Sequence, residues 1–110
     1  MKRKKITLHA RGDLDAISTF IARNNYTAAE RFYHVTVHHF ENLPDILTPE
    51  RASPLLPEEV RKLQVKGFSG YTLHIAIFED AIYLLSAFRP GLSDIQKIAH
   101  TKQSLKHRDR

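Results

Sequence analysis

Apolar and polar residues alternate at the start of the chain and then take up a helical period. The alternation over residues 4–9 predicts a half-buried first strand. Gly12 is expected to break this strand, and Asp13 and Asp15 lie where acids favour the first turn of a helix. The asparagines at 24–25 are expected to end that helix. Its apolar residues recur at helical spacing: Leu14, Ile17, Phe20 and Ile21.

A second helix is predicted to begin two or three residues later. Thr27 and Glu30 form a capping-box pattern, in which the threonine hydroxyl accepts from a backbone N–H and the glutamate reaches back to the cap. Pro44 closes the helix. The residues on its core-facing side are Ala29, Phe32, Thr36, Phe40 and Leu43. Because the connection is short, the two helices should form an antiparallel hairpin.

The second half of the chain predicts a surface connection followed by strands. Residues 44–59 contain four prolines and show no clear period, which is typical of a loop. Turns at 67–70 and 79–80 then separate three stretches of strand composition, at 61–66, 71–78 and 81–88. The third stretch is almost entirely apolar, as expected of a central strand that is covered on both faces.

A short helix is predicted at the C-terminus, where Ser93 and Gln96 offer another capping box. Its apolar face is thin, and its basic end at 102–110 is expected to fray. The element order is therefore β-α-α-β-β-β-α, an α+β fold in which a helical hairpin packs on a small, mainly antiparallel sheet. One domain is expected over residues 1–110, with a core at about 4–92 and a C-terminal basic helix or tail at 93–110.

The composition of the chain limits the kinds of functional site it can form and indicates where in the cell it is expected. The chain has no cysteine, which excludes disulfides, thiolate metal sites and cysteine nucleophiles. Residues 1–26 and 60–110 carry net charges of +4 and +5, whereas residues 27–59 carry −4. Such basic ends suit RNA, DNA or an acidic protein partner, although a solvated surface explains them equally well. No secretory leader or membrane-spanning stretch is evident, so a soluble cytoplasmic protein is expected.

Several blocks of sequence resemble the RelE/ParE family of toxins. The blocks lie at 13–22, 25–32, 43–44, 60–71 and 82–85, in the family's order, and the likeness extends over roughly residues 6–95. It implies the toxin of a type II toxin–antitoxin system, held inactive in a hetero-oligomer by a cognate antitoxin.

Two departures from the family pattern bear on mechanism. Ribonuclease members usually carry an arginine where this chain has Thr72, and the segment at 88–92 matches the family only loosely. The block at 60–71 is similar to the ParE-like branch, which implies inhibition of DNA gyrase without hydrolysis. The alternative is a RelE-like ribosome-dependent mRNA endonuclease. A further alternative is a non-toxic relative that only binds a partner.

Candidate functional residues follow from these interpretations. If the chain is a ribonuclease, the candidate catalytic residues are His74, Arg89 and Lys66, since RNA cleavage needs a proton acceptor and cations around the phosphate. His74 alternates with core residues and should lie on the opposite face of the sheet. The candidates for binding the target or the antitoxin are Arg61, Lys62, Lys66, Phe68, Tyr71 and Arg89.

No metal or cofactor is expected. His38 and His39 are adjacent on a predicted helix, so their side chains point about 100° apart and make a poor chelating pair. The sequence also lacks a phosphate-cradling glycine loop and a recognisable catalytic triad.

Overall fold

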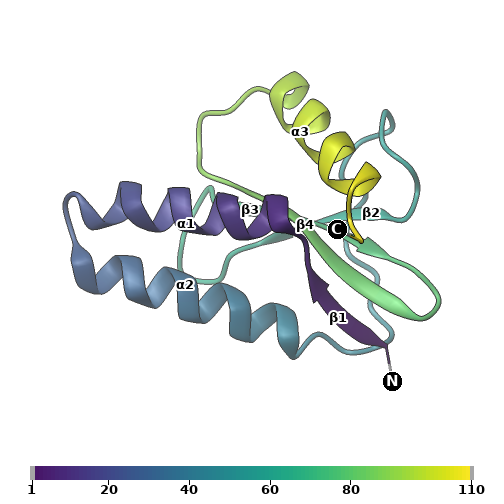
Figure 1. The fold of residues 1–110 in the computed structure, drawn as a ribbon, viewed down its shortest axis with the longest axis horizontal. Coiled ribbons are helices and arrows are strands. Elements are labelled where there is room, and N and C mark those ends of the chain that lie inside the picture. Colours follow the sequence, from purple (N-terminus) through teal and green to yellow (C-terminus); the bar gives the residue numbers. More distant parts are fainter. Residues whose placement is uncertain (1, 110) are drawn as a thin grey trace.

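The computed structural model describes residues 2–109 and has the element order that the sequence predicts (Figure 1). The elements within these residues are β1 (Arg3–Ile6), α1 (Leu8–Ala22), α2 (Tyr26–Glu41), β2 (Val60–Gln64), β3 (Thr72–Ile77), β4 (Ala81–Phe88) and α3 (Asp94–Lys106). None of the described helices is long and apolar enough to cross a membrane.

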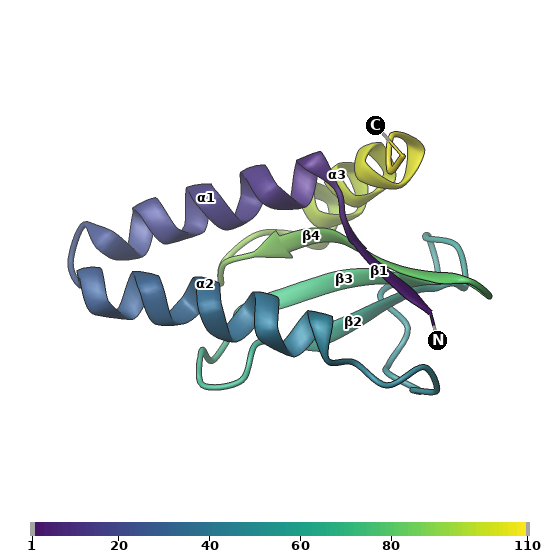
Figure 2. The ribbon, with the colours of Figure 1, turned by 60° about the horizontal axis from the view of Figure 1, so that its bottom comes forward.

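The strands of the described chain form one mixed sheet in the order β1-β4-β3-β2. β1 runs parallel to β4, while the pairs β2–β3 and β3–β4 are antiparallel, so the prediction of a mainly antiparallel sheet is confirmed. α1 and α2 lie side by side and together cover one face of the sheet (Figure 2). α3 packs on the other face. Every residue of β4 is buried, as the sequence predicts for a covered central strand.

The main core lies between the hairpin and the sheet. Phe32 and Phe40 of α2 are completely buried there, together with Leu14 of α1. The same core includes Leu73 and Ile75 of β3, with Ile77 partly buried against it. The helical face predicted for α2 is the buried one, because helical spacing gathers these side chains on a single stripe. A smaller apolar cluster lies under α3 and includes Val60, Ala76, Tyr83 and Leu85.

The first strand is shorter, and the first helix longer, than the sequence predicts. β1 ends at Ile6, and the hydroxyl of Thr7 caps α1 by accepting from the Ala10 amide at 3.0 Å. Leu8 is therefore helical, and the strand predicted to residue 9 is wrong. Gly12 lies inside α1 and does not break it. A glycine in a helix costs about 1 kcal/mol relative to alanine, and the packing of the buried α1 residues against the core offsets this cost.

The second helix begins at a different cap from the predicted one. The side chain of Asn25 accepts from the Ala28 amide at 2.9 Å, so α2 starts at Tyr26. Thr27, the predicted cap, lies in the first turn of the helix and is exposed. Asparagine and threonine are both good caps, and the extended backbone of Asn25 decides between them here.

α3 has the predicted capping box at Ser93 and Gln96, and it docks through fully buried polar residues beside the partly buried Ile98 and Leu105. Its buried residues are Thr101 and Ser104. Thr101 contacts both the His74 ring and the Ser86 hydroxyl at 2.8 Å. A helix with a thin apolar face is thus held by hydrogen bonds to polar groups of the sheet.

The end of α3 is also anchored, contrary to the expected fraying. The helix continues to Lys106, and the Arg108 guanidinium lies over the rings of Phe78 and Tyr83 at 4.9 and 5.6 Å. The Tyr83 hydroxyl donates to Asp109 at 2.8 Å. The predicted basic end reaches to residue 110, which lies outside the described residues.

Thr101→Val should destabilise the protein by about 2 kcal/mol, because it leaves two buried polar partners without a hydrogen bond. The matched control is Thr36→Val. The Thr36 hydroxyl is also buried but has no hydrogen-bond partner among the described residues, so this replacement should leave stability unchanged or raise it. Urea denaturation of both variants measures the difference. Equal losses would show that the Thr101 hydroxyl does not hold α3.

Candidate functional site

A hollow in the described surface lies between α1, the end of β4 and the connection to α3. This α1–β4 cleft has a volume of about 770 Å³. Apolar side chains make up much of its lining, with charged groups at its margins. The residues that matter for its chemistry are Asp13, Phe20, Arg23, Phe88, Arg89 and His100.

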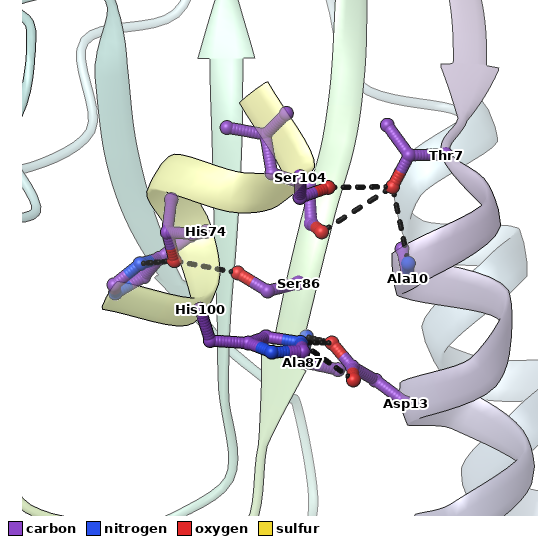
Figure 3. A network of polar contacts seen from close by, with 10 residues as sticks. Thr7, Ala10, Asp13, His74, Ser86, Ala87, His100 and Ser104 are labelled. Atoms are coloured by element: carbon purple, nitrogen blue, oxygen red, sulfur yellow. Dashed lines mark hydrogen bonds and ion pairs between the residues drawn. The ribbon is translucent and has the colours of Figure 1, made fainter. Parts of the chain in front are cut away.

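Asp13 occupies one end of the cleft and joins three elements of the fold (Figure 3). Both of its carboxylate oxygens accept from Nε2 of His100, at 2.8 and 2.9 Å. One of them also accepts from the backbone N–H of Ala87 at 3.0 Å. α1, β4 and α3 therefore meet at a single carboxylate.

The position of Asp13 follows from the unequal lengths of two strands. β1 pairs with residues 81–84 of β4, so the rest of β4 extends beyond β1 with no strand on that side. Side chains from the start of α1 take the place of the missing strand. The Thr7 hydroxyl contacts the Leu85 carbonyl at 3.3 Å, and Asp13 accepts from Ala87. Buried backbone groups need such partners, which explains why a carboxylate lies here.

The pairing with Asp13 changes the proton affinity of His100. Hydrogen bonding to the carboxylate raises the pKa of His100 above its usual value and outweighs the opposing effect of partial burial. The charged imidazolium is therefore favoured beside Asp13. The pair acts as an ionic link between α1 and α3 at one wall of the cleft.

Arg89 also lines the cleft and directly follows the last residue of β4. Its guanidinium is 4.5 Å from the centre of the Phe20 ring of α1. No carboxylate of residues 2–109 forms an ion pair with Arg89 or with Arg23, which also lines the cleft. Arg89, a candidate from the sequence, is thus exposed in the cleft and available to a ligand.

His74 lies in a second, smaller cleft on the α3 side of the sheet. This β2–α3 cleft of about 530 Å³ also includes Lys62, Thr72 and Lys97. His74 is only 4% exposed and its Nδ1 hydrogen-bonds the Thr101 hydroxyl, so it lies on the face predicted for it. Burial, with smaller effects of Lys97 and Lys62, lowers the pKa of His74 to about 4. The ring is therefore neutral at physiological pH and is held in place by α3.

The remaining candidates from the sequence are spread over other parts of the surface. Arg61 and Lys62 point to opposite faces of β2; Arg61 contacts the Pro49 carbonyl at 3.3 Å, and Lys62 is 3.7 Å from Glu50. Lys66 is exposed in the turn after β2. The structure does not gather the predicted binding residues into one site.

Phe68 and Tyr71, the aromatic candidates, pack inward. Their ring centroids lie 5.2 and 5.4 Å from that of the fully buried Phe32. Both side chains are partly buried against the main core. Only a part of each ring is therefore available for stacking on a base or docking a partner.

The sequence did not identify His100, nor the role of Asp13. The two residues are 87 positions apart, and Asp13 was expected only as a favourable charge near a helix start. The one sequence signal for their pairing is weak: His100 belongs to the same side of α3 as Thr101 and Ser104, which marks a polar docking face. Among the described residues no group of three or more His, Asp or Glu is arranged to hold a metal ion.

Comparison with known proteins identifies the fold. No protein-family model matches the sequence, and no curated protein is significantly similar to it. The structure is similar to a chain from the solved structure of the chromosomal ParDE TA system from P. aeruginosa, with a TM-score of 0.67. The match covers 83% of this chain and 98% of that chain at 21% identity. At this identity the likeness shows that the two chains share a fold, and it confirms the α+β architecture that the RelE/ParE resemblance implies.

The Asp13–His100 pair should make stability depend on pH above neutrality. Since the pKa of His100 is raised by folding, its contribution is complete below the unfolded value of about 6.5 and is lost as the pH rises through the folded pKa. The wild type should therefore lose stability relative to His100→Gln as the pH rises from about 6.5 through the raised pKa of His100 in the folded protein. His38→Gln, which changes an exposed histidine of α2, serves as the control and should follow the wild type. Parallel urea-denaturation profiles for all three proteins would contradict the ionic link.

Proposed function

We propose that this chain is the toxin of a toxin–antitoxin pair, neutralised by a cognate antitoxin that binds it directly. The observation that carries the proposal is the shared fold with a chain of a ParDE TA system, which extends over nearly the whole of that chain. The sequence blocks that resemble RelE/ParE toxins lie mainly in α1, α2 and the β2–β4 meander of this fold.

Within that class we propose a ParE-like action, in which the chain binds DNA gyrase and poisons it without hydrolysing a substrate. The arrangement of the ribonuclease candidates supports this choice. A general base must reach its substrate within hydrogen-bond distance, whereas His74 is buried and already bonded to Thr101. Arg89 lines a different cleft from His74, and Lys66 lines neither.

The position of Thr72 supports the same choice. Thr72 lies at the start of β3 and lines the β2–α3 cleft, where a family ribonuclease would carry its arginine. A threonine hydroxyl provides no positive charge for a phosphorane-like transition state. The remaining cations of that cleft are lysines, which bind phosphate as point charges and lack the bidentate geometry of arginine.

Expression of this chain alone in bacteria should arrest growth, and a pulse of radioactive precursors given just after induction tests the mechanism. For a ParE-like toxin, incorporation of thymidine falls first, with a DNA-damage response and trapped gyrase. If incorporation of methionine stops at once and messages acquire new ends, the chain is an mRNA endonuclease. Robust growth with soluble, folded protein would remove the toxin assignment and leave a partner-binding relative.

Arg89→Ala should weaken toxicity more than His38→Ala does. Arg89 is a cation of the α1–β4 cleft with no carboxylate partner among residues 2–109, whereas His38 lies on the exposed side of α2. Loss of the contact with Phe20 costs about 0.5–1 kcal/mol at an exposed site, so both variants should remain folded. Colony counts after graded induction, at matched soluble protein levels, give the comparison. Equal toxicity of the two variants would remove Arg89 from the site.

A further inference from the structure

We propose that the α1–β4 cleft is the docking site for an acidic segment of the partner protein, anchored in the cleft by a bulky apolar side chain. The identity of this partner as the antitoxin rests on the function proposed above. The location of the site and the chemistry of its occupant rest on the cleft itself, and they can be tested separately.

The apolar residues that line the cleft favour an occupant with an apolar side chain. Ile17, Phe88 and Leu92 line it from three different segments of the chain. Phe20 also lines the cleft, is 40% exposed and lies beside the Arg89 guanidinium. Exposed aromatic residues around a concave apolar surface are typical of protein interaction sites.

The charged residues that line the cleft favour an occupant with acidic residues beside that apolar side chain. The negative charge of Asp13 is already compensated by His100 and by the Ala87 amide. Arg23 and Arg89, by contrast, have no carboxylate partner among residues 2–109. Asp15 is then the remaining acid in the lining, so an occupant meets an excess of positive charge.

The shape of the cleft favours a segment of polypeptide. Its lining follows α1 from Asp13 to Arg23, which corresponds to about 15 Å along a helix axis. A site of this length accommodates about two or three turns of a helix. The Asp13–His100 link holds α3 against α1 at one end, so the cleft exists before the partner arrives, and less ordering is required on binding.

Selection of a random peptide library displayed on phage, with the purified full chain as bait, tests the site directly and requires no natural partner. The enriched peptides should carry a bulky apolar residue within one helical turn of Asp or Glu. Their affinity, measured by calorimetry on synthetic copies, should fall as the salt concentration rises, because the arginines are exposed.

Substitutions at Ala16 test whether the selected peptides bind in the α1–β4 cleft. Ala16 is exposed on α1 and lines the cleft. Ala16→Glu adds both bulk and negative charge and should lower the affinity for the peptides by at least about tenfold. Ala16→Gln adds bulk alone and should lower the affinity less. The control Ala99→Glu places the same side chain on the exposed face of α3, outside the cleft, and should leave affinity unchanged. All three replacements are good helix formers, so folding is preserved.

Several outcomes would overturn the assignment. These are the absence of any enriched peptide, enrichment of peptides without acidic residues, and binding that Ala16→Glu does not affect. A concentration-dependent dimer of the chain that Ala16→Glu abolishes would assign the cleft to a second copy instead. Because these are binding measurements on purified protein, they can succeed when the chain fails to arrest growth, and they can fail when it is toxic.

Discussion

The fold depends on how the exposed edge of β4 is completed beyond the end of β1. β4 is one of the two inner strands of the described sheet, and its backbone must be satisfied along its whole length because all of its residues are buried. Thr7 and Asp13 provide the partners that β1 is too short to offer. This requirement draws the start of α1 against β4. The hairpin that follows is thereby positioned over the sheet, and a carboxylate is left facing α3.

The two faces of the sheet are covered by different kinds of interaction. The hairpin face is a continuous apolar core, with Phe32 and Phe40 completely buried. The α3 face combines a small apolar cluster with hydrogen bonds through Thr101 and Ser104. Hydrogen bonds contribute less net stability than apolar burial, yet they penalise any shift that breaks them. α3 is therefore positioned specifically by a helix face that carries little hydrophobic driving force.

Local patterns in the sequence predict the fold well but the candidate site poorly, for a physical reason. Helical spacing identified the buried face of α2, and the uninterrupted apolar run identified β4 as the central strand. The boundaries at Thr7 and Asn25 were missed because the choice between neighbouring caps depends on tertiary packing. The pairing of Asp13 with His100 was unforeseeable, since it joins side chains that only the folded sheet brings together.

The placement of the titratable and cationic side chains explains why we propose an activity based on binding a protein and not on catalysis. Acid–base catalysis would require a titratable group that is both exposed and close to cations. The structure divides these properties. His74 has neighbouring lysines but is buried and neutral. Arg89 is exposed, but the histidine that lines the same cleft, His100, is paired with Asp13. The α1–β4 cleft combines apolar lining residues with two arginines that no carboxylate of residues 2–109 neutralises. Those properties suit recognition of an acidic protein surface better than the chemistry of phosphodiester cleavage.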